Sequence, residues 1–437
     1  DVVPISDKKI MLLKRFAECF VDTRNLRFIE HSILDLVSQR VYGLCLGYED
    51  VNDHDVVRRD RLLALVVGKN DVEGNCRRHE SDKGIPLAGK STLNRLEQVP
   101  FASEMNRYHK IGYTAESVDQ LMTDIFLESF KKSPKQIFLD LDTTDAILHG
   151  NQEGRYFHGY YDNYCYTPLY IFCGEQLLLS RLQSANVDAA AHAVVEVKRV
   201  VEQIRGTWPE VEIVVRGDSG FCRDELMSWC EENKVCYIFG LAKNARLLTR
   251  IEKKMKKSRR RYFGNRKATR RYADFIYRTQ KSWSKSRRVV VKAEYLDKGS
   301  NPRFIVTNLN KNIYKTQMIY EKIYCARGEM ENRIKEQQMD LYADRVSTTQ
   351  MKSNQLRLYF SGMAYVLMQA FRRLGLAGTE YAKAQCGTIR TKLMKLGALV
   401  KISVRRIVIS MANACPYANI LRQAWRNLNR SSIPITT

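Results

Sequence analysis

The sequence predicts a multidomain α+β protein, in which a mixed sheet flanked by helices carries a β-rich insertion and is bordered by helical regions. Three patterns predict it: helical spacing of apolar residues over residues 1–115, strands alternating with helices from residue 136, and a dense basic block after residue 245. A chain of 437 residues that is 44% hydrophobic is long enough for two or three domains. We expect a helical N-terminal region at 1–115, a mixed-sheet domain at 116–345 interrupted by the insertion at 245–312, and a helical C-terminal region at 346–437.

The N-terminal region has a simple helical pattern. Ile29–Leu46 and Asp55–Val67 carry apolar residues at helical spacing, and Asn70–Gly84 is a polar, glycine-containing loop. We expect a further helix at Ser91–Gln98, with Ser91 as its N-cap.

The central region alternates between strands and helices. Its first strand, Gln136–Asp142, is short and apolar and ends in an acid. The turn Gly174–Glu175 indicates a hairpin. The predicted elements that follow the first strand are strands Tyr164–Cys173 and Gln176–Leu182, helix Val187–Ile204, strand Glu212–Val215, helix Arg223–Asn233 and strand Val235–Gly240.

The insertion begins with the densest basic block of the chain. Residues 250–288 hold 17 Lys and Arg against two acids, with aromatic residues between them. Such a mixture favours a surface that follows a DNA backbone, although a merely solvated face is the alternative. We assign Arg259, Arg260, Arg270 and Arg271 to this surface.

The remaining elements complete the predicted fold. Strands are expected at Val289–Glu294 and Arg303–Thr307, around a turn at 298–300, and a long helix at Tyr314–Leu341. Residues 349–437 are predicted to be helical. Their helices are expected to break near Gly375–Gly378, Gly387 and Pro416, and their basic tail contains Arg405, Arg406, Arg422, Arg426 and Arg430.

Charge and cysteine content limit the classes of function. The net charge of +24 and the pI near 9.6 favour a polyanionic partner, nucleic acid first, over a basic protein without one. The 11 cysteines include no Cys-x-x-Cys pair, so we interpret them as reduced core residues. No apolar run reaches the ~18 residues of a membrane span, and no signal peptide is visible. We therefore expect a cytoplasmic protein.

Two acids stand where strands end. Asp142 closes the first strand and Asp218 follows the strand at 212–215, so both carboxylates could share one sheet edge. Two divalent cations about 3.5–4 Å apart, as phosphoryl transfer uses, prefer carboxylate oxygens. Asp140 competes with Asp142, because alternate residues of a strand point to the same side. We prefer Asp142, which lies at the strand end.

A third acid is expected from a helix downstream. Tyr324, Arg327, Glu331 and Gln338 fall on one face of the predicted helix, and Arg327 could hold a phosphate. A solvated face with salt bridges is the alternative.

These residues resemble the motifs of insertion-sequence transposases of the Asp-Asp-Glu class. Leu141–Thr144 resembles the first-acid segment, Arg216–Phe221 the second, and Tyr324–Glu331 the Tyr-x2-Arg-x3-Glu part of the Tyr-Arg-Glu-Lys signature. His149–Arg155 and Glu331–Glu336 resemble one large bacterial subgroup. The chain departs from the signature where its lysine would fall, at Gln338, and Lys335 could take over that phosphate contact.

The resemblance implies both a fold and a reaction. It implies an RNase H-like catalytic domain that uses Mg²⁺ or Mn²⁺, with two ions held by Asp142, Asp218 and Glu331. It further implies terminal inverted repeats and target DNA as partners, a homodimer when the ends are paired, cut-and-paste movement and a place on the bacterial nucleoid. Tyr324, Arg327, Lys335, Gln338 and Arg345 would contact the DNA. The alternatives are a catalytically silent DNA-binding relative and a nuclease without strand transfer.

Two further patterns are weaker. Gly84–Ser91 matches a nucleotide-binding loop but lacks the preceding buried strand, so we expect Lys90 and Arg95 to face DNA instead. His149, His158 and Asp162 have a loose metal-like spacing, which we interpret as polar loop residues. The neighbouring residues Gln152, Glu153 and Arg155 are candidates for lining the site.

Overall fold

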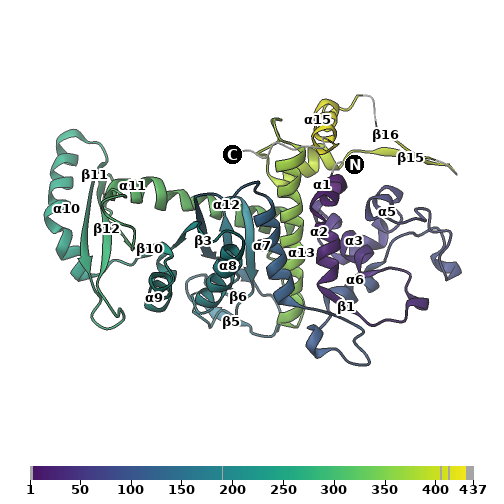
Figure 1. Cartoon of the computed structure of the whole chain (residues 1–437), viewed down its shortest axis with the longest axis horizontal. Coiled ribbons are helices and arrows are strands. Elements are labelled where there is room, and N and C mark those ends of the chain that lie inside the picture. Colours follow the sequence, from purple (N-terminus) through teal and green to yellow (C-terminus); the bar gives the residue numbers. More distant parts are fainter. Residues whose placement is uncertain (1–2, 189, 404–405, 412–413, 430–437) are drawn as a thin grey trace.

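The computed structural model describes residues 3–188, 190–403, 406–411 and 414–429. The molecule is elongated (Figure 1). The N-terminal helices and the C-terminal segments lie at one end, a central sheet occupies the middle, and the basic helix α10 with its neighbouring strands forms the other end. Among the described residues, no helix is both long and apolar enough to span a membrane.

The central sheet is mixed, as predicted. Its eight successive strands run in the order β11-β12-β14-β10-β9-β3-β7-β8, and the two-residue strand β13 pairs with β12. Strands β3, β9 and β10 are parallel, whereas all the other pairs are antiparallel. The strands span β3 Gln136–Thr143, β7 Leu169–Cys173, β8 Gln176–Arg181, β9 Glu212–Gly217, β10 Cys236–Leu241, β11 Thr269–Tyr277, β12 Arg287–Leu296, β13 Gly299–Ser300 and β14 Arg303–Thr307.

Both faces of this sheet are covered. Successive side chains of a strand point in opposite directions, so each strand contributes to the apolar packing on both faces. In β9, Ile213 and Val215 join the apolar cluster that contains helix α8, whereas Val214 joins a second cluster that contains Ile319 and Ile323. The bounds of the covering helices are α7 Ala115–Glu128, α8 Ala193–Thr207 and α9 Asp224–Glu232. The predicted helix Val187–Ile204 thus begins only at Ala193.

The predicted long helix Tyr314–Leu341 is a helical path with two irregular turns. It begins as α11 Thr316–Met318, continues through a π-helical segment Ile319–Tyr324 and a 3₁₀ turn Cys325–Arg327, and ends as α12 Gly328–Leu341. π-Helical segments inside helices are rare and frequently occur at functional sites.

The N-terminal region is mainly helical, as predicted, with local differences. The helix predicted at Asp55–Val67 is two helices, because Asp60 caps the second one. The N-cap predicted at Ser91 is wrong: α6 begins at Lys90, and Gly89 occupies the cap position. The elements are α1 Val3–Ile10, α2 Leu12–Glu18, β1 Phe20–Asp22, α3 Ile33–Cys45, α4 His54–Val57, α5 Arg61–Val67, α6 Lys90–Glu97 and β2 Ile111–Tyr113.

The N- and C-terminal regions share one apolar core. Helix α13, Met351–Ala370, is buried at every position from Ser353 onward except Arg357. It packs against α3, and residues of both helices belong to the same cluster. The two regions therefore stabilise each other.

The C-terminal region is not wholly helical. The breaks predicted near Gly375–Gly378 and Pro416 are present, whereas Gly387 lies within helix α14 Cys386–Ile389. Strands β15 Ala398–Ile402 and β16 Ile407–Met411 form a hairpin where helix was expected. This part of the prediction is wrong. Helices α14 and α15 Ala418–Asn429 flank the hairpin. Arg405 and Arg430 of the basic tail lie outside the described residues.

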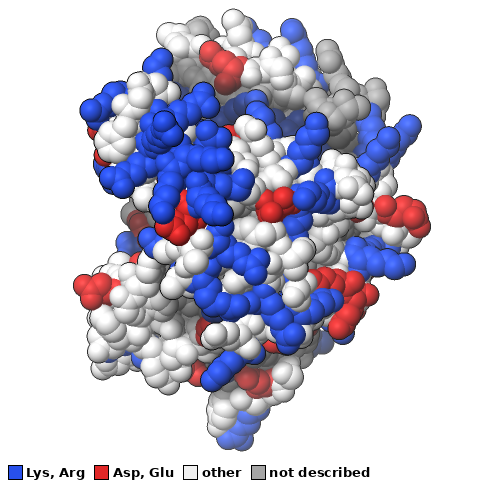
Figure 2. Space-filling view, turned by 90° about the vertical axis from the view of Figure 1, so that its left-hand side faces the viewer, with Lys and Arg blue, Asp and Glu red and all other residues white. Residues whose placement is uncertain are grey.

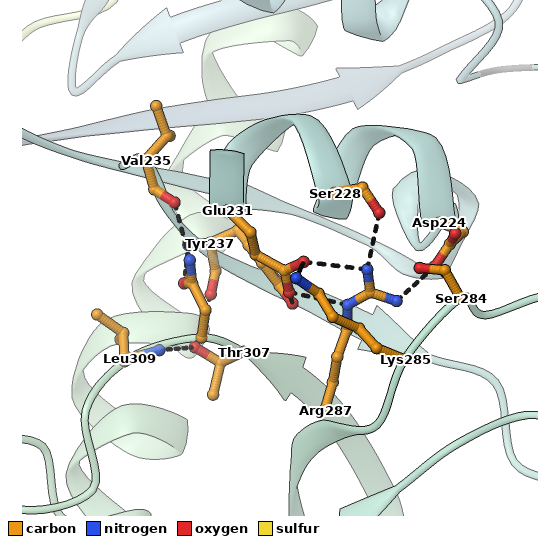
Figure 3. A network of polar contacts seen from close by, with 11 residues as sticks. Asp224, Ser228, Glu231, Val235, Tyr237, Ser284, Lys285, Arg287, Thr307 and Leu309 are labelled. Atoms are coloured by element: carbon orange, nitrogen blue, oxygen red, sulfur yellow. Dashed lines mark hydrogen bonds and ion pairs between the residues drawn. The ribbon is translucent and has the colours of Figure 1, made fainter. Parts of the chain in front are cut away.

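The insertion extends the central sheet. Its basic block starts not as a strand but as α10 Ala245–Asn265, and the strands β11, β12 and β14 continue the sheet from β10. Arg287, the first residue of β12 and only 4% exposed, anchors the insertion to α9. Its guanidinium donates to Asp224, to Ser228 Oγ at 3.0 Å and to Glu231 Oε1 at 2.9 Å (Figure 3). These contacts join the first residue of β12 to helix α9.

Candidate active site

A cleft of about 740 Å³ lies over the carboxyl ends of β3 and β9. All three predicted carboxylates, Asp142, Asp218 and Glu331, line it. The cleft is lined by Asp142, Thr143, Thr144, His158, Tyr160, Tyr161, Thr167, Val187, Asp218, Ser219, Gly220, Arg327, Glu331, Ile334, Lys335 and Gln338.

The sheet register brings the two aspartates to one edge. Strands β3 and β9 are parallel neighbours, and their last paired residues are Asp140 and Arg216. Asp142 and Asp218 each lie two residues beyond this pair, so both reach the same edge. Asp218 also caps a 3₁₀ turn, because its Oδ1 accepts a hydrogen bond from the amide of Gly220 at 2.8 Å.

A glycine on the neighbouring strand makes room for this turn. A Cβ atom at Gly240 in β10 would lie 2.8 Å from the amide nitrogen of Ser219 and 2.9 Å from Tyr324 Oη. Real Cβ atoms essentially never approach so closely. Gly240 therefore allows the Asp218 turn and the ring of Tyr324 to pack against the strand.

The structure separates the roles of Asp140 and Asp142. Asp140 is 4% exposed and accepts two hydrogen bonds from Arg216, at 2.6 Å each. Arg216 also donates to the carbonyl oxygen of Ile323 at 2.6 Å. The carboxylate of Asp140 is thus paired with Arg216 in the protein interior, whereas Asp142 lines the cleft.

The pKa of Asp142 is raised to about 6. Burial is the largest cause, and the neighbouring charge of Asp218 raises the pKa further. Arg327 acts in the opposite direction, with its Nη1 donating to Asp142 Oδ2 at 3.0 Å. The carboxylate therefore carries a charge that the protein only partly compensates.

Glu331 is held more loosely than the two aspartates. Its side chain is 55% exposed, and Oε1 lies 3.9 Å from Arg327 Nη2. The guanidinium of Arg327 thus contacts both Asp142 and Glu331.

The donor set fits a hard divalent cation, since Mg²⁺ and Mn²⁺ prefer carboxylate oxygens. The spacing requires an adjustment first. Among the described residues, no three His, Cys, Asp or Glu side chains are gathered closely enough to hold one ion. Arg327 would have to leave Asp142, and Glu331 would have to approach the aspartates.

The other predicted site residues have different positions. Lys335 and Gln338 line the cleft, and Gln338 Nε2 donates to the carbonyl oxygen of Asp145 at 3.0 Å. Tyr324 lies beneath the Asp218 turn, at Gly240, rather than in the lining. Arg345 forms an ion pair with Glu49 beside a neighbouring pocket of about 550 Å³.

The segment after β3 differs from the prediction. Gln152, Glu153 and Arg155 are not among the residues that line the cleft. Gln152 and Glu153 instead connect this loop to the C-terminal side of the chain, through the carbonyl oxygen of Val346 and the amide of Met351. Further along this segment, His158, Tyr160 and Tyr161 line the cleft. His158 is interpreted from the sequence only as a polar loop residue, and Tyr160 and Tyr161 are not among the predicted site residues. The aromatic run around residue 160 was the available signal.

A second concave surface lies on the insertion. It encloses about 700 Å³ and is predominantly basic, and it includes the predicted Arg270 and Arg271. Figure 2 faces this end of the molecule and shows Lys and Arg side chains gathered densely on it. The predicted Arg259 and Arg260 are exposed on α10. The concave surface is lined by Arg250, Lys253, Lys254, Lys257, Arg270, Arg271, Tyr272, Gln317 and Glu321.

The weaker sequence patterns acquire structural explanations. Turns and a short 3₁₀ helix, not a strand, precede Gly84–Ser91. Lys90 forms an ion pair with Asp55 at 3.1 Å. The cysteines form no disulfide among the described residues, and they divide between buried ones such as Cys230 and exposed ones such as Cys325.

The fold and the carboxylate cleft define a class of protein, and comparison with known families gives its name. The sequence model of the family described as "Transposase DDE domain group 1" matches residues 2–433. The chain belongs to this family and is a DDE transposase, a DNA-cleaving enzyme. The class predicted from the motifs is thereby confirmed, and proteins of this class generally use divalent metal ions.

A solved structure is also similar to the chain. It is a cryo-EM structure of the piggyBac transposase synaptic complex with hairpin DNA, with 10% sequence identity and a TM-score of 0.43, and the match covers 100% of this chain and 87% of that chain. Among curated proteins, none matches this chain significantly.

Proposed function

We propose that this transposase moves an insertion sequence by a cut-and-paste route. It recognises terminal inverted repeats, cleaves DNA to free 3′-OH ends, and joins these ends to target DNA. One observation carries the proposal: parallel neighbours β3 and β9 bring Asp142 and Asp218 to one edge, under a helix that contributes Glu331 to the same cleft.

We further propose that the catalytic domain is RNase H-like. The strand order β8-β7-β3-β9-β10 supports this, with β7 antiparallel to both of its neighbours and β3, β9 and β10 parallel. Helices α8 and α9, in the connections before and after β9, leave the carboxyl ends of these strands open for the cleft.

Asp142, Asp218 and Glu331 would hold two Mg²⁺ or Mn²⁺ ions. When bound, such ions supply the charge that activates an attacking oxygen and stabilises the leaving 3′ oxygen. The carboxylates can bind them because they supply oxygen ligands in a wet, open cleft. No covalent protein–DNA intermediate is needed, so no serine or tyrosine is assigned as a nucleophile.

The basic side chains of the cleft would position the DNA. Arg327 can exchange Asp142 for a phosphate, and its planar guanidinium suits two phosphate oxygens at once. Lys335, exposed on α12, lies close enough to the cleft to take the phosphate contact of the signature lysine that Gln338 replaces. Tyr324 would support the Asp218 turn, and Arg345 would reach DNA from the neighbouring pocket.

The other regions would hold the rest of the DNA. The basic surface around α10 is suited to a phosphate backbone. We assign residues 1–115 to binding of the ends, 116–345 to catalysis with the insertion at 245–312, and 346–437 to contacts in a homodimer. The substrate would be the DNA of the bacterial nucleoid, which the enzyme reaches in the cytoplasm.

The proposal is tested by replacing the first acid. We expect Asp142→Ala to abolish Mn²⁺-dependent cleavage of transposon-end DNA while the affinity for that DNA is kept. Asp145→Ala is the matched control, because Asp145 lines the neighbouring pocket and not the cleft. Full cleavage activity of Asp142→Ala would refute the assignment.

Strand transfer is tested separately. Incubating the enzyme with a pre-cleaved end and a plasmid should give a joined product. Hydrolysis alone would favour a nuclease of the same fold, and DNA binding without cleavage would favour a catalytically silent relative.

A further inference from the structure

An aromatic cluster borders the catalytic cleft on a small sheet of its own. This sheet consists of β4 Ala146–Ile147, β6 Asn163–Tyr166 and β5 Tyr156–His158, in that order. Its strands and the turn between β5 and β6 expose large rings, and Tyr160 in the turn is 86% exposed. The exposed rings are Tyr156, Phe157, Tyr160 and Tyr164.

The residue next to Tyr160 anchors this turn to the cleft. Tyr161, the next residue, packs its ring 4.8 Å from His158, and its Oη donates to the carbonyl oxygen of Thr143 at 3.4 Å. Thr143 follows Asp142 directly, so this contact ties the turn to the site. The ring of Tyr160 stands nearly perpendicular to that of Tyr161, at 81° and 5.1 Å.

The backbone of the turn is also constrained. Asp162 has a φ of 54°, in the left-handed region, and its amide donates to the carbonyl oxygen of His158 at 2.9 Å. Left-handed backbone outside glycine is uncommon and persists where the surrounding structure holds it in place. The turn thus holds the backbone of Tyr160 beside the cleft and leaves its ring exposed there.

An exposed ring beside a phosphoryl-transfer site suits one kind of ligand. Aromatic side chains stack on the faces of nucleobases, and they do so with little preference for sequence. In duplex DNA these faces are covered by the neighbouring bases, so a base must first leave the stack. The rim of the cleft therefore favours DNA with an unpaired base at the cleavage point.

We propose that Tyr160 stacks on an unpaired base of the DNA strand whose phosphate lies at Asp142 and Asp218. This proposal rests on the function proposed above, because it requires DNA in the cleft. It adds a recognition site for a nucleobase, and it makes the aromatic turn a positioning element for the strand that is cut.

The experiment compares two DNA probes of the same arbitrary sequence. One duplex is fully paired, and the other carries a single unpaired 2-aminopurine in its centre. Binding of the full chain to each is measured by fluorescence anisotropy in EDTA, and 2-aminopurine emission reports stacking directly. We expect the wild type to bind the unpaired probe more tightly, by roughly 5- to 150-fold, and to quench its emission.

Variants locate the effect. Tyr160→Ala should abolish both the preference and the quenching, whereas Tyr160→Phe should keep them because it retains the ring. Tyr156→Ala is the matched control, since Tyr156 is 47% exposed on the same small sheet and does not line the cleft.

The possible outcomes distinguish this proposal from the proposed function. If Tyr160→Ala keeps the preference, or the wild type shows none while still cleaving paired DNA with Mn²⁺, the stacking site is refuted and the transposase function stands. If the wild type binds neither probe, the stacking site is refuted as well, whereas the transposase function is tested separately by cleavage of transposon-end DNA.

Discussion

Arg216 and Asp140 form a buried, bidentate ion pair, in which Nε and Nη2 of the arginine each lie 2.6 Å from a carboxylate oxygen. The pair joins the parallel strands β9 and β3 at their last shared register position. It removes Asp140 from the set of available ligands and leaves Asp142, two residues later, as the carboxylate that faces the cleft.

This relationship predicts that the two aspartates fail in different ways when replaced. Asp140→Ala would leave Arg216 buried without its partner, which typically costs about 3–5 kcal/mol of unfolding free energy. Asp142→Ala should show no such loss of stability and should abolish cleavage. Urea unfolding and a DNA cleavage assay measure the two effects. A stable but inactive Asp140→Ala enzyme would instead give Asp140 the role assigned to Asp142.

A second prediction concerns Arg327, whose guanidinium contacts both Asp142 and Glu331. Without DNA, this positive charge repels a divalent cation that approaches the carboxylates. Arg327→Ala should therefore tighten Mn²⁺ binding to the free enzyme, by roughly tenfold or about 1.4 kcal/mol, yet reduce cleavage because the variant cannot hold the phosphate. Electron paramagnetic resonance at pH 8 measures the bound Mn²⁺. Arg327→Lys, which keeps the charge, is the control, and weaker Mn²⁺ binding by Arg327→Ala would contradict the argument.

The raised pKa of Asp142 predicts a pH-dependent difference in stability. Burial raises this pKa from its usual 3.8 to about 6 in the folded protein, so folding favours the protonated carboxyl. The stability that the protonated Asp142 carboxyl contributes is fully present below about pH 3.8 and is lost as the pH rises through 6. Asp142→Asn cannot ionise. In EDTA, the unfolding free energy of Asp142→Asn should therefore rise relative to that of the wild type between pH 4 and 7, by up to about 3 kcal/mol in total. Above pH 7 the difference should stay constant.

The matched control for the pH series is Thr144→Ala. Thr144 lines the same cleft but carries no ionisable group, so this variant should show no comparable trend. A difference between Asp142→Asn and the wild type that stays constant from pH 4 to 8 would show that Asp142 is not desolvated.

Local sequence patterns were sufficient for the parts of the site that depend on strand ends. The apolar run at 136–142 and the turn Gly174–Glu175 predicted β3 and the β7–β8 hairpin, both of which the structure confirms. Parallel neighbouring strands end at the same edge of a sheet, so the acids that end or follow these strands could be placed at that edge. Asp140 remained an alternative to Asp142 as the first acid. Side-chain alternation places both residues on one side of the strand, and it does not show which of them pairs with an arginine of the neighbouring strand.

The parts that sequence reasoning missed depend on long-range contacts or on patterns that carried two meanings. The insertion joins the central sheet through pairing of β14 with β10, a contact that no local pattern encodes. The prediction for the basic run at 245–265 rested on its charge, and a helix and a strand can both present such a charge at the surface. In the C-terminal region, the alternating β-branched residues of 400–411 did carry a strand signal, which the surrounding helical pattern obscured.

The last prediction concerns the basic surface of the insertion. If Lys253, Lys254 and Lys257 bind phosphates, replacing all three with Ala should weaken DNA binding in a salt-dependent manner. The slope of log Kd against log salt concentration should fall by about 0.9 for each phosphate that the variant no longer neutralises. The control replaces Lys131, Lys132 and Lys135, which are exposed near the amino end of β3, opposite to the end that carries the cleft, and whose replacement removes the same charge. Equal weakening in both triple variants would mean that only net charge matters, because the position of the lysines would then be irrelevant to DNA binding.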